Sequence, residues 1–119
     1  MSKILLVEDD KDLLNIYREE LKYSGIDFDI AETGKDAIDK DASFEYDVIL
    51  LDIMLPDIQG LEVLKKVKMR NKDKKVIIIS NLEVPAMINE AYSLGVSAYL
   101  IKAELLPSQI IEEVRRVLE

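Results

Sequence analysis

Short apolar runs alternate along the chain with longer segments in which apolar residues recur at helical spacing. Three runs contain only apolar residues, which is typical of strands buried on both faces of a parallel sheet. They are Ile4–Val7, Val48–Leu51 and Val76–Ile79. Two weaker runs, Phe28–Ala31 and Ala98–Ile101, complete a set of five predicted strands.

The segments between these runs predict helices. In four of them, apolar residues three or four positions apart form a single face. These faces consist of Leu13, Leu14, Tyr17 and Leu21; Leu61, Leu64 and Val67; Met87, Ile88, Ala91 and Leu94; and Ile110, Ile111, Val114, Val117 and Leu118. A shorter and weaker helix is expected at Gly34–Lys40, with Thr33 as its N-cap. Pro85 and Pro107 stand where helices are expected to start.

A strand followed by a helix, repeated about five times, predicts a doubly wound α/β domain. Strands joined by single helices run parallel, and right-handed connections place the helices on both faces of the sheet. A length of 119 residues suits one domain over residues 1–119, with a sizeable core. In such folds the functional site lies at the carboxyl ends of the strands, near the reversal of strand order.

The chain is acidic, with 16 basic and 24 acidic residues and a net charge of −8. An acidic surface disfavours direct binding to nucleic acid and to anionic membranes. The densest basic stretch, residues 65–75, alternates with apolar residues, so we expect it to be a solvated helix face and loop. No charged and apolar leader precedes the first strand, and no apolar stretch approaches the roughly 20 residues that span a bilayer. We therefore expect a cytoplasmic protein.

Cysteine and histidine are both absent from the chain. Their absence excludes disulfides, thiolate metal sites and every nucleophile that depends on a histidine base. The polar residues that remain for chemistry directly follow four of the five predicted strands. They are Glu8, Asp9 and Asp10 after the first strand, Asp52 after the third, Ser80 and Asn81 after the fourth, and Lys102 after the fifth.

Glu8, Asp9 and Asp52 are expected to converge at one edge of the sheet. Converging carboxylates repel one another by about 1–4 kcal/mol per pair, so such a cluster needs a cation or protons. A hard divalent cation with oxygen ligands, such as Mg²⁺, would relieve the repulsion, and Lys102 supplies a fixed positive charge. For any single acid the alternative is a helix N-cap, and Asp10 is the candidate for that role.

The order and spacing of these residues resemble the receiver domains of two-component response regulators, the CheY-like family. The resemblance covers the chain from Ile4 to the last helix. It rests on Glu8–Asp9, Asp52, Pro56, Gly60, Ser80, Ala91–Gly95, Tyr99 and Lys102. It implies a (βα)5 sandwich with a five-stranded parallel sheet in the flavodoxin-like order 2-1-3-4-5 and helices on both faces.

The resemblance also implies a phosphoacceptor and a metal site. Asp52 would accept a phosphoryl group from the phosphohistidine of a sensor histidine kinase or a histidine phosphotransfer protein. Mg²⁺, or Mn²⁺, would be bound by Asp9, Asp52 and the backbone carbonyl of Met54. Glu8 would act mostly through a metal-bound water.

The remaining implied roles concern the response to phosphorylation. Ser80 would hydrogen-bond the phosphoryl group, Lys102 would pair with it, and Tyr99 would turn inward when Ser80 moves. The face made by the fourth helix, fifth strand and fifth helix would dock a downstream protein or form a homodimer. Because the chain ends with its last predicted helix, we expect a stand-alone receiver. It would not be an enzyme beyond catalysing its own phosphorylation and dephosphorylation.

Three positions depart from the family pattern. Ala103 stands where the family usually has proline after the lysine, so we expect a trans Lys102–Ala103 bond. Asn81 stands where a small residue is common, and Met54 stands where many members carry a polar side chain. Both flank the path of an attacking water, and they are therefore candidates for tuning the lifetime of the phosphorylated state.

Other functions compete with this reading. A phosphorylation-independent interaction module on the same scaffold would not need the acidic, hydroxyl and lysine positions, all of which are present. A phosphatase with Asp52 as nucleophile, like the haloacid dehalogenase phosphatases, would need a second aspartate where this chain has Met54. A flavin or nucleotide carrier is disfavoured because no glycine-rich phosphate loop follows the first strand.

Overall fold

One parallel sheet of five strands forms the centre of the protein, as seen in a computed structural model that describes residues 2–119. The strand order is β2-β1-β3-β4-β5, and each neighbouring pair is parallel. The strands are β1 (Lys3–Val7), β2 (Asp27–Ala31), β3 (Val48–Asp52), β4 (Lys75–Ser80) and β5 (Ala98–Ile101). The predicted doubly wound fold and its strand order are therefore confirmed.

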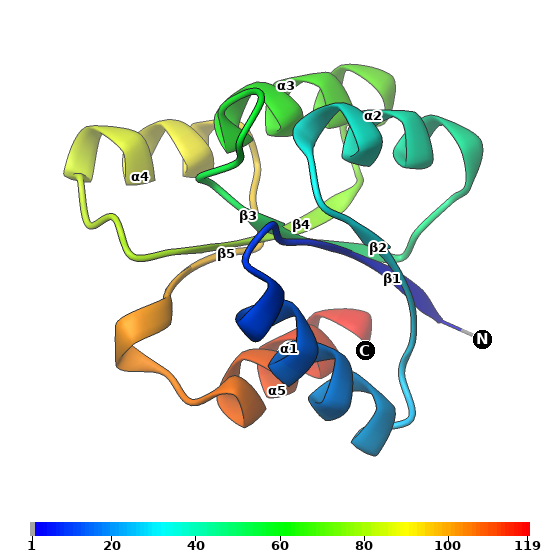
Figure 1. Ribbon diagram of the computed structural model, residues 1–119. Coiled ribbons are helices and arrows are strands. Elements are labelled where there is room, and N and C mark those ends of the chain that lie inside the picture. The colour runs from blue at the N-terminus through cyan, green and yellow to red at the C-terminus, as the bar shows by residue number, and fades with distance from the viewer. Residues whose placement is uncertain (1) are drawn as a thin grey trace.

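Five helices cover the two faces of this sheet (Figure 1). α1 and α5 lie on one face, and α2, α3 and α4 lie on the other. The helices are α1 (Lys11–Tyr23), α2 (Gly34–Ser43), α3 (Gly60–Arg70), α4 (Pro85–Ser93) and α5 (Pro107–Leu118), and a 3-10 turn, η1 (Lys102–Glu104), follows β5. The short helix predicted from Gly34 exists and continues to Ser43. Each helix within residues 2–119 is too short or too polar to span a bilayer.

The three central strands are buried on both faces, as their apolar runs predict. Successive strand residues point to opposite faces, so each central strand contributes to two cores. In β1, Leu5 and Val7 pack on the side of α2 and α3, whereas Ile4 and Leu6 pack on the side of α1 and α5. Packing from both sides fixes the carboxyl ends of β1, β3 and β4, from which the candidate site is built.

Side chains cap the starts of α1 and α2 at the two residues that the sequence predicts. The Asp10 carboxylate accepts hydrogen bonds from the backbone N–H groups of Asp12 and Leu13, at 2.9 and 3.2 Å. The Thr33 hydroxyl accepts one from the Asp36 N–H at 3.0 Å. The two prolines are the first residues of α4 and α5. Asp10 is therefore the N-cap of α1, a role that differs from those expected of the neighbouring acids Glu8 and Asp9.

The basic stretch at residues 65–75 is only partly the solvated surface that its spacing predicts. Lys74 is buried, and its Nζ lies 2.6 Å from a backbone carbonyl before β3 and 3.1 Å from Glu45. The Arg70 guanidinium lies 2.9 Å from the buried carboxylate of Asp41. The prediction is wrong for Lys74, because its carboxylate partner Glu45 stands 29 residues earlier in the sequence, beyond the reach of helical periodicity. Arg70 is exposed, as predicted, although it also pairs with Asp41.

Candidate functional site

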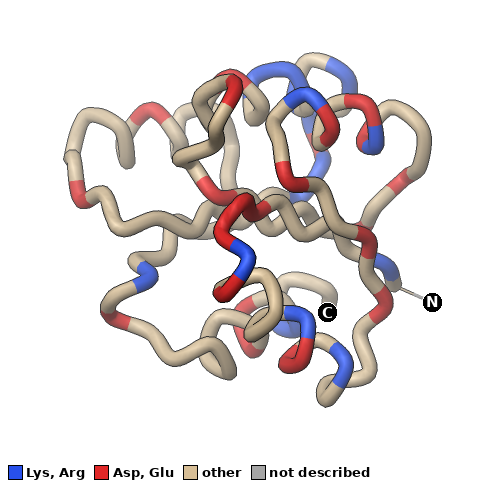
Figure 2. The backbone as a smooth tube through the Cα atoms, viewed as in Figure 1, with Lys and Arg blue, Asp and Glu red and all other residues tan. Residues whose placement is uncertain are grey.

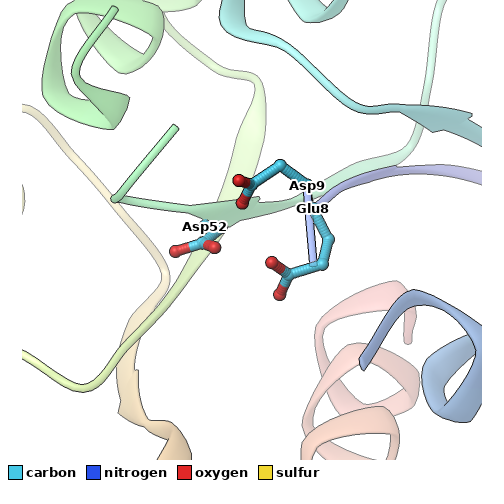
Figure 3. Close-up of side chains that lie close together, drawn as sticks. All are labelled: Glu8, Asp9 and Asp52. Carbon is cyan, nitrogen blue, oxygen red and sulfur yellow. The ribbon is translucent and has the colours of Figure 1, made fainter. Parts of the chain in front are cut away.

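Three carboxylates meet at the carboxyl edge of the sheet. Glu8 follows β1, and Asp52 is the last residue of the neighbouring strand β3. One carboxylate oxygen from each of Glu8, Asp9 and Asp52 lies within 4.8 Å of the others, and the three groups point toward a common space (Figure 3). Glu8 and Asp52 are buried, whereas Asp9 is exposed. In Figure 2 the acidic run between β1 and α1 stands out along the backbone.

Lys102 joins two of these carboxylates from β5's side of the sheet. Its Nζ lies 2.9 Å from Glu8 Oε1 and 3.1 Å from Asp52 Oδ2. Burial alone would lower the pKa of Lys102, but the Glu8 and Asp52 carboxylates outweigh burial and raise it. Lys102 is therefore a permanent cation within the site.

One ammonium does not neutralise three carboxylates. Burial, followed by the neighbouring Asp52 carboxylate, raises the pKa of Glu8 to about 7, although Lys102 opposes the shift. Near neutral pH, the cluster therefore tends either to keep a proton or to attract an external cation. Its ligand atoms are carboxylate oxygens, the donors that Mg²⁺ and Mn²⁺ prefer, and the exposed Asp9 faces solvent. The residues present fit a hard divalent cation.

The loop after β3 folds back over Asp52. The Met54 backbone N–H donates to Asp52 Oδ1 at 3.0 Å, which holds this carboxylate and places the Met54 main chain beside it. Gly60 permits the loop by close packing, because a Cβ there would lie 2.5 Å from the Ile53 Cα and 2.8 Å from the Asp52 carbonyl oxygen. The Gly60 N–H also donates to the Ile53 carbonyl at 2.8 Å. Only glycine fits this position without moving the loop.

A hydrogen-bonded path leads from the site to α4. Ser80 is buried at the end of β4, and its Oγ accepts a bond from the Leu82 N–H at 2.9 Å. The phenol of Tyr99 in β5, a half-buried residue, donates to the Leu82 carbonyl at 2.8 Å. The Tyr99 backbone N–H donates in turn to the phenol oxygen of Tyr92 in α4 at 3.2 Å. Tyr92 is thus a third residue on the path, beyond the predicted pair of Ser80 and Tyr99. The spacing of Tyr92 in the sequence does not predict this contact.

The structure also locates the three departures from the family pattern. The Met54 side chain is 61% exposed and lines the same cleft as Asp52 and Lys102. Asn81 lines this cleft too, and its Oδ1 accepts a hydrogen bond from the Ala103 N–H at 3.0 Å. Every peptide bond of the described residues is trans, so the expected trans bond between Lys102 and Ala103 is confirmed.

Asp57 is a further residue of the loop after β3 that the sequence did not single out. Its two carboxylate oxygens accept bonds from the backbone N–H groups of Gly34 and Lys35, at 2.8 and 2.9 Å. These bonds lower the pKa of Asp57. The carboxylate thereby caps α2 from a distant loop and ties the loop that follows Asp52 to the helical layer. The sequence gives no sign of this role, because Asp57 precedes α3 and not α2.

Comparison with known proteins assigns the class. The sequence model of the response regulator receiver domain matches residues 4–115, so the chain belongs to the response regulator receiver family. It is 42% identical over 80 residues to response regulator ArlR of Staphylococcus saprophyticus, covering 67% of this chain and 36% of that protein. It is 32% identical over 102 residues to response regulator ArlR of Staphylococcus aureus, covering 86% and 46%. The chain spans less than half the length of these curated relatives.

A solved structure gives the same result for the fold. The chain superposes on a CheY-like response regulator receiver domain protein from Methanospirillum hungatei JF-1 with a TM-score of 0.92. The two are 26% identical, and the alignment covers 99% of this chain and 94% of that one. The resemblance found in the sequence is therefore confirmed by both comparisons.

Proposed function

We propose that this chain is a phosphorylation-dependent switch of a two-component phosphorelay, with Asp52 as the phosphoacceptor. The observation that carries the proposal is the setting of the Asp52 carboxylate. It is buried at the end of the central strand, one oxygen lies 3.1 Å from Lys102, and the carboxylates of Glu8 and Asp9 lie beside it. The Asp52 carboxylate thus places a nucleophilic oxygen beside a fixed cation and beside carboxylates that can bind a divalent cation.

In the proposed reaction an Asp52 carboxylate oxygen attacks the phosphorus of a phosphohistidine on a sensor histidine kinase or a histidine phosphotransfer protein. The new O–P bond forms as the P–N bond breaks, and the imidazole leaves with the electron pair. Lys102 and the Ser80 hydroxyl would stabilise the negative charge on the phosphoryl oxygens. Mg²⁺ or Mn²⁺, held by Asp9, Asp52 and the Met54 carbonyl with Glu8 acting through a bound water, would supply further positive charge when bound.

Loss of the phosphoryl group returns the protein to its starting state. A water attacks phosphorus, the O–P bond to Asp52 breaks, and inorganic phosphate leaves as the carboxylate reforms. We propose no other reaction for this chain, so its only catalysis would be its own phosphorylation and dephosphorylation. The exposed Met54 side chain lines the cleft, and in this proposal it would limit access of that water.

The path from Ser80 to α4 supports the proposed output. The Ser80 hydroxyl can donate to a phosphoryl oxygen while it accepts from the Leu82 N–H, because a hydroxyl does both. A shift of Ser80 would then be felt at Leu82, whose carbonyl holds Tyr99, and at Tyr92 in α4. A downstream protein or a second copy of the chain would dock on the α4–β5–α5 face. The proposal includes one receiver domain over residues 1–119, a protein partner and not nucleic acid or membrane, and a cytoplasmic location.

Beryllofluoride, a phosphoryl analogue, provides a test that needs no cognate kinase. In amide NMR spectra with Mg²⁺, its addition should shift the signals of Leu82, Tyr92 and Tyr99 in the native chain. Asp52→Asn should show none of these shifts, whereas the control Asp73→Asn, in an exposed turn, should respond like the native chain. Unchanged signals in the native chain would favour the phosphorylation-independent interaction module and overturn the proposal.

A further inference from the structure

The loops that follow β4 and β5 are joined by a single side-chain hydrogen bond. Asn81, next to Ser80, extends its carboxamide across the edge of the sheet, where its Oδ1 accepts from the Ala103 N–H at 3.0 Å. Because β4 and β5 are neighbouring strands, this bond connects the loop that directly follows Ser80, the hydroxyl of the site, to the turn that carries its ammonium, Lys102.

The bond satisfies a donor that η1 leaves free. The first N–H groups of a helical turn have no partner within the turn and are satisfied by side chains or water. In η1 the turn itself is closed by the Leu105 N–H and the Lys102 carbonyl, at 3.4 Å. Ala103 can give its N–H to Asn81, whereas a proline would have no N–H to give. The bond therefore requires both residues: an amide oxygen at Asn81 and a backbone N–H at Ala103.

The Ala103 N–H belongs to the same peptide unit as the Lys102 carbonyl. A lysine side chain is long and has many rotamers, so where its ammonium rests depends on a fixed backbone origin. Here that ammonium must lie between two acceptors, at 2.9 Å from Glu8 and 3.1 Å from Asp52. The hydrogen bond from the Ala103 N–H to Asn81 fixes the peptide unit between Lys102 and Ala103. It thereby fixes the backbone from which the Lys102 side chain extends.

We propose that Asn81 is a positioning residue, which acts through the Ala103 N–H to hold Lys102 where its ammonium reaches Asp52. The inference rests on the proposed function, since the position of Lys102 affects labelling only if Asp52 is the phosphoacceptor. Asn81 Oδ1 is already engaged by Ala103, and the exposed carboxamide retains its two N–H donors at the cleft. The main effect of Asn81 on the site is therefore to hold the backbone of η1 in place.

A double-mutant cycle tests the dependence between the two residues. The native chain, Asn81→Ala, Ala103→Pro and the double variant are labelled with acetyl phosphate and Mg²⁺, and the labelling rate is followed by intact mass. Each single substitution should slow labelling by about fivefold, the size of one hydrogen bond. Proline should slow nothing further in the Asn81→Ala background, because the bond is already absent. The control Ala103→Gly keeps the N–H and should label close to the native rate.

A second measurement covers the case in which proline prevents folding. Hydrogen exchange of the Ala103 amide should be slow in the native chain and fast in Asn81→Ala. An equal effect of proline in both backgrounds, or unchanged exchange at Ala103, would overturn the inference. So would an Asn81→Ala protein that is less stable but labels at the native rate, since Asn81 would then be a cap only. Absence of labelling in the native chain would instead overturn the proposed function.

Discussion

Two clusters of charged side chains lie at opposite edges of the sheet, and they differ in their balance of charge. The basal cluster, at the amino ends of the strands, consists of Asp41, Glu45, Arg70 and Lys74. Arg70 pairs with Asp41 and Glu45 at 2.9 Å each, and Lys74 pairs with Glu45 at 3.1 Å. Arg70 and then Lys74 hold the pKa of Glu45 below its usual value. Two acids meet two bases, and each charge has a partner within the protein.

The acidic site, at the carboxyl ends, consists of Glu8, Asp9, Asp52 and Lys102. Three acids share one base, and the pKa of Glu8 is raised instead of lowered. The comparison shows that burial of charge alone does not mark a functional site, since Asp41 and Lys74 are as buried as Asp52. The two clusters differ instead in the excess of negative charge at the acidic site, which a bound cation or a proton would neutralise.

The largest expected effect comes from removing one partner of the basal cluster. Arg70→Ala leaves the buried Asp41 carboxylate without its cation, so the free energy of unfolding should fall by about 2–3 kcal/mol, less than for a fully buried pair because Arg70 is partly exposed. Urea unfolding measures the loss. Lys66→Ala, an exposed lysine of α3, is the control and should change stability by under about 0.5 kcal/mol. Equal losses for the two variants would contradict a stabilising basal cluster.

The pH dependence of stability should report the acidic site. In the folded protein Glu8 keeps its proton up to about pH 7, whereas in the unfolded chain it loses it near 4.5. Between these values the folded state binds more protons, so without Mg²⁺ stability should fall by about 2 kcal/mol as pH rises from 4.5 to 7.

Other carboxylates act in a different pH window. Asp29, Glu45 and Asp57 have lowered pKa values, so their contributions are present above their unfolded pKa values and are lost only in more acidic solution. Urea midpoints measured across pH 4.5–7 with a chelator should therefore isolate Glu8, and Glu8→Gln should flatten the profile. A slope that persists in Glu8→Gln would assign the titration to another group.

A smaller gain in stability is expected from Asp9→Asn. This substitution removes one of the mutually repelling charges without Mg²⁺ present, which should stabilise the protein by about 0.5–1 kcal/mol given the exposure of Asp9. The same variant should lose most of its Mg²⁺ binding, so Mg²⁺ should raise the melting temperature of the native chain only. Thermal melts with and without Mg²⁺ measure both effects, and a strongly destabilised Asp9→Asn would show Asp9 to be a structural residue.

The smallest effect concerns the lifetime of the phosphorylated protein. Met54 cannot orient a water by a strong hydrogen bond, and its side chain stands at the edge of the cleft. Met54→Asn should therefore shorten the lifetime by about threefold, a barrier change below 1 kcal/mol. Met69→Asn, at an exposed methionine of α3, is the matched control and should leave the decay unchanged. Equal or slower decay in Met54→Asn would mean that water access is governed elsewhere.

The sheet and the acidic site could be predicted from the sequence, because both depend on short apolar runs and on the residues that directly follow them. The runs from Ile4, Val48 and Val76 are apolar throughout, and strands in a parallel sheet end at one edge. Glu8, Asp52 and Lys102 therefore had to lie near one another once the strand order was known.

The remaining contacts could not be predicted, because each joins a polar side chain to a distant part of the chain. Asp57 caps α2 from the loop before α3, and Asn81 reaches Ala103 in the turn after β5. The same holds for Arg70 and Asp41, whose pairing depends on how α2 and α3 lie side by side. The spacing of apolar residues does not indicate which distant segment a polar side chain will contact, so such pairs are found only in the three-dimensional structure.

The most direct test of the acidic site as a phosphoacceptor is the intact mass of the protein after incubation with acetyl phosphate. The native chain should gain the mass of one phosphoryl group with Mg²⁺ and none with a chelator. Asp52→Asn should gain none under either condition, while Arg70→Ala, altered only in the basal cluster, should still be labelled at a temperature where it is folded. Labelling of Asp52→Asn to the native extent, or labelling of the native chain without a divalent cation, would contradict the account.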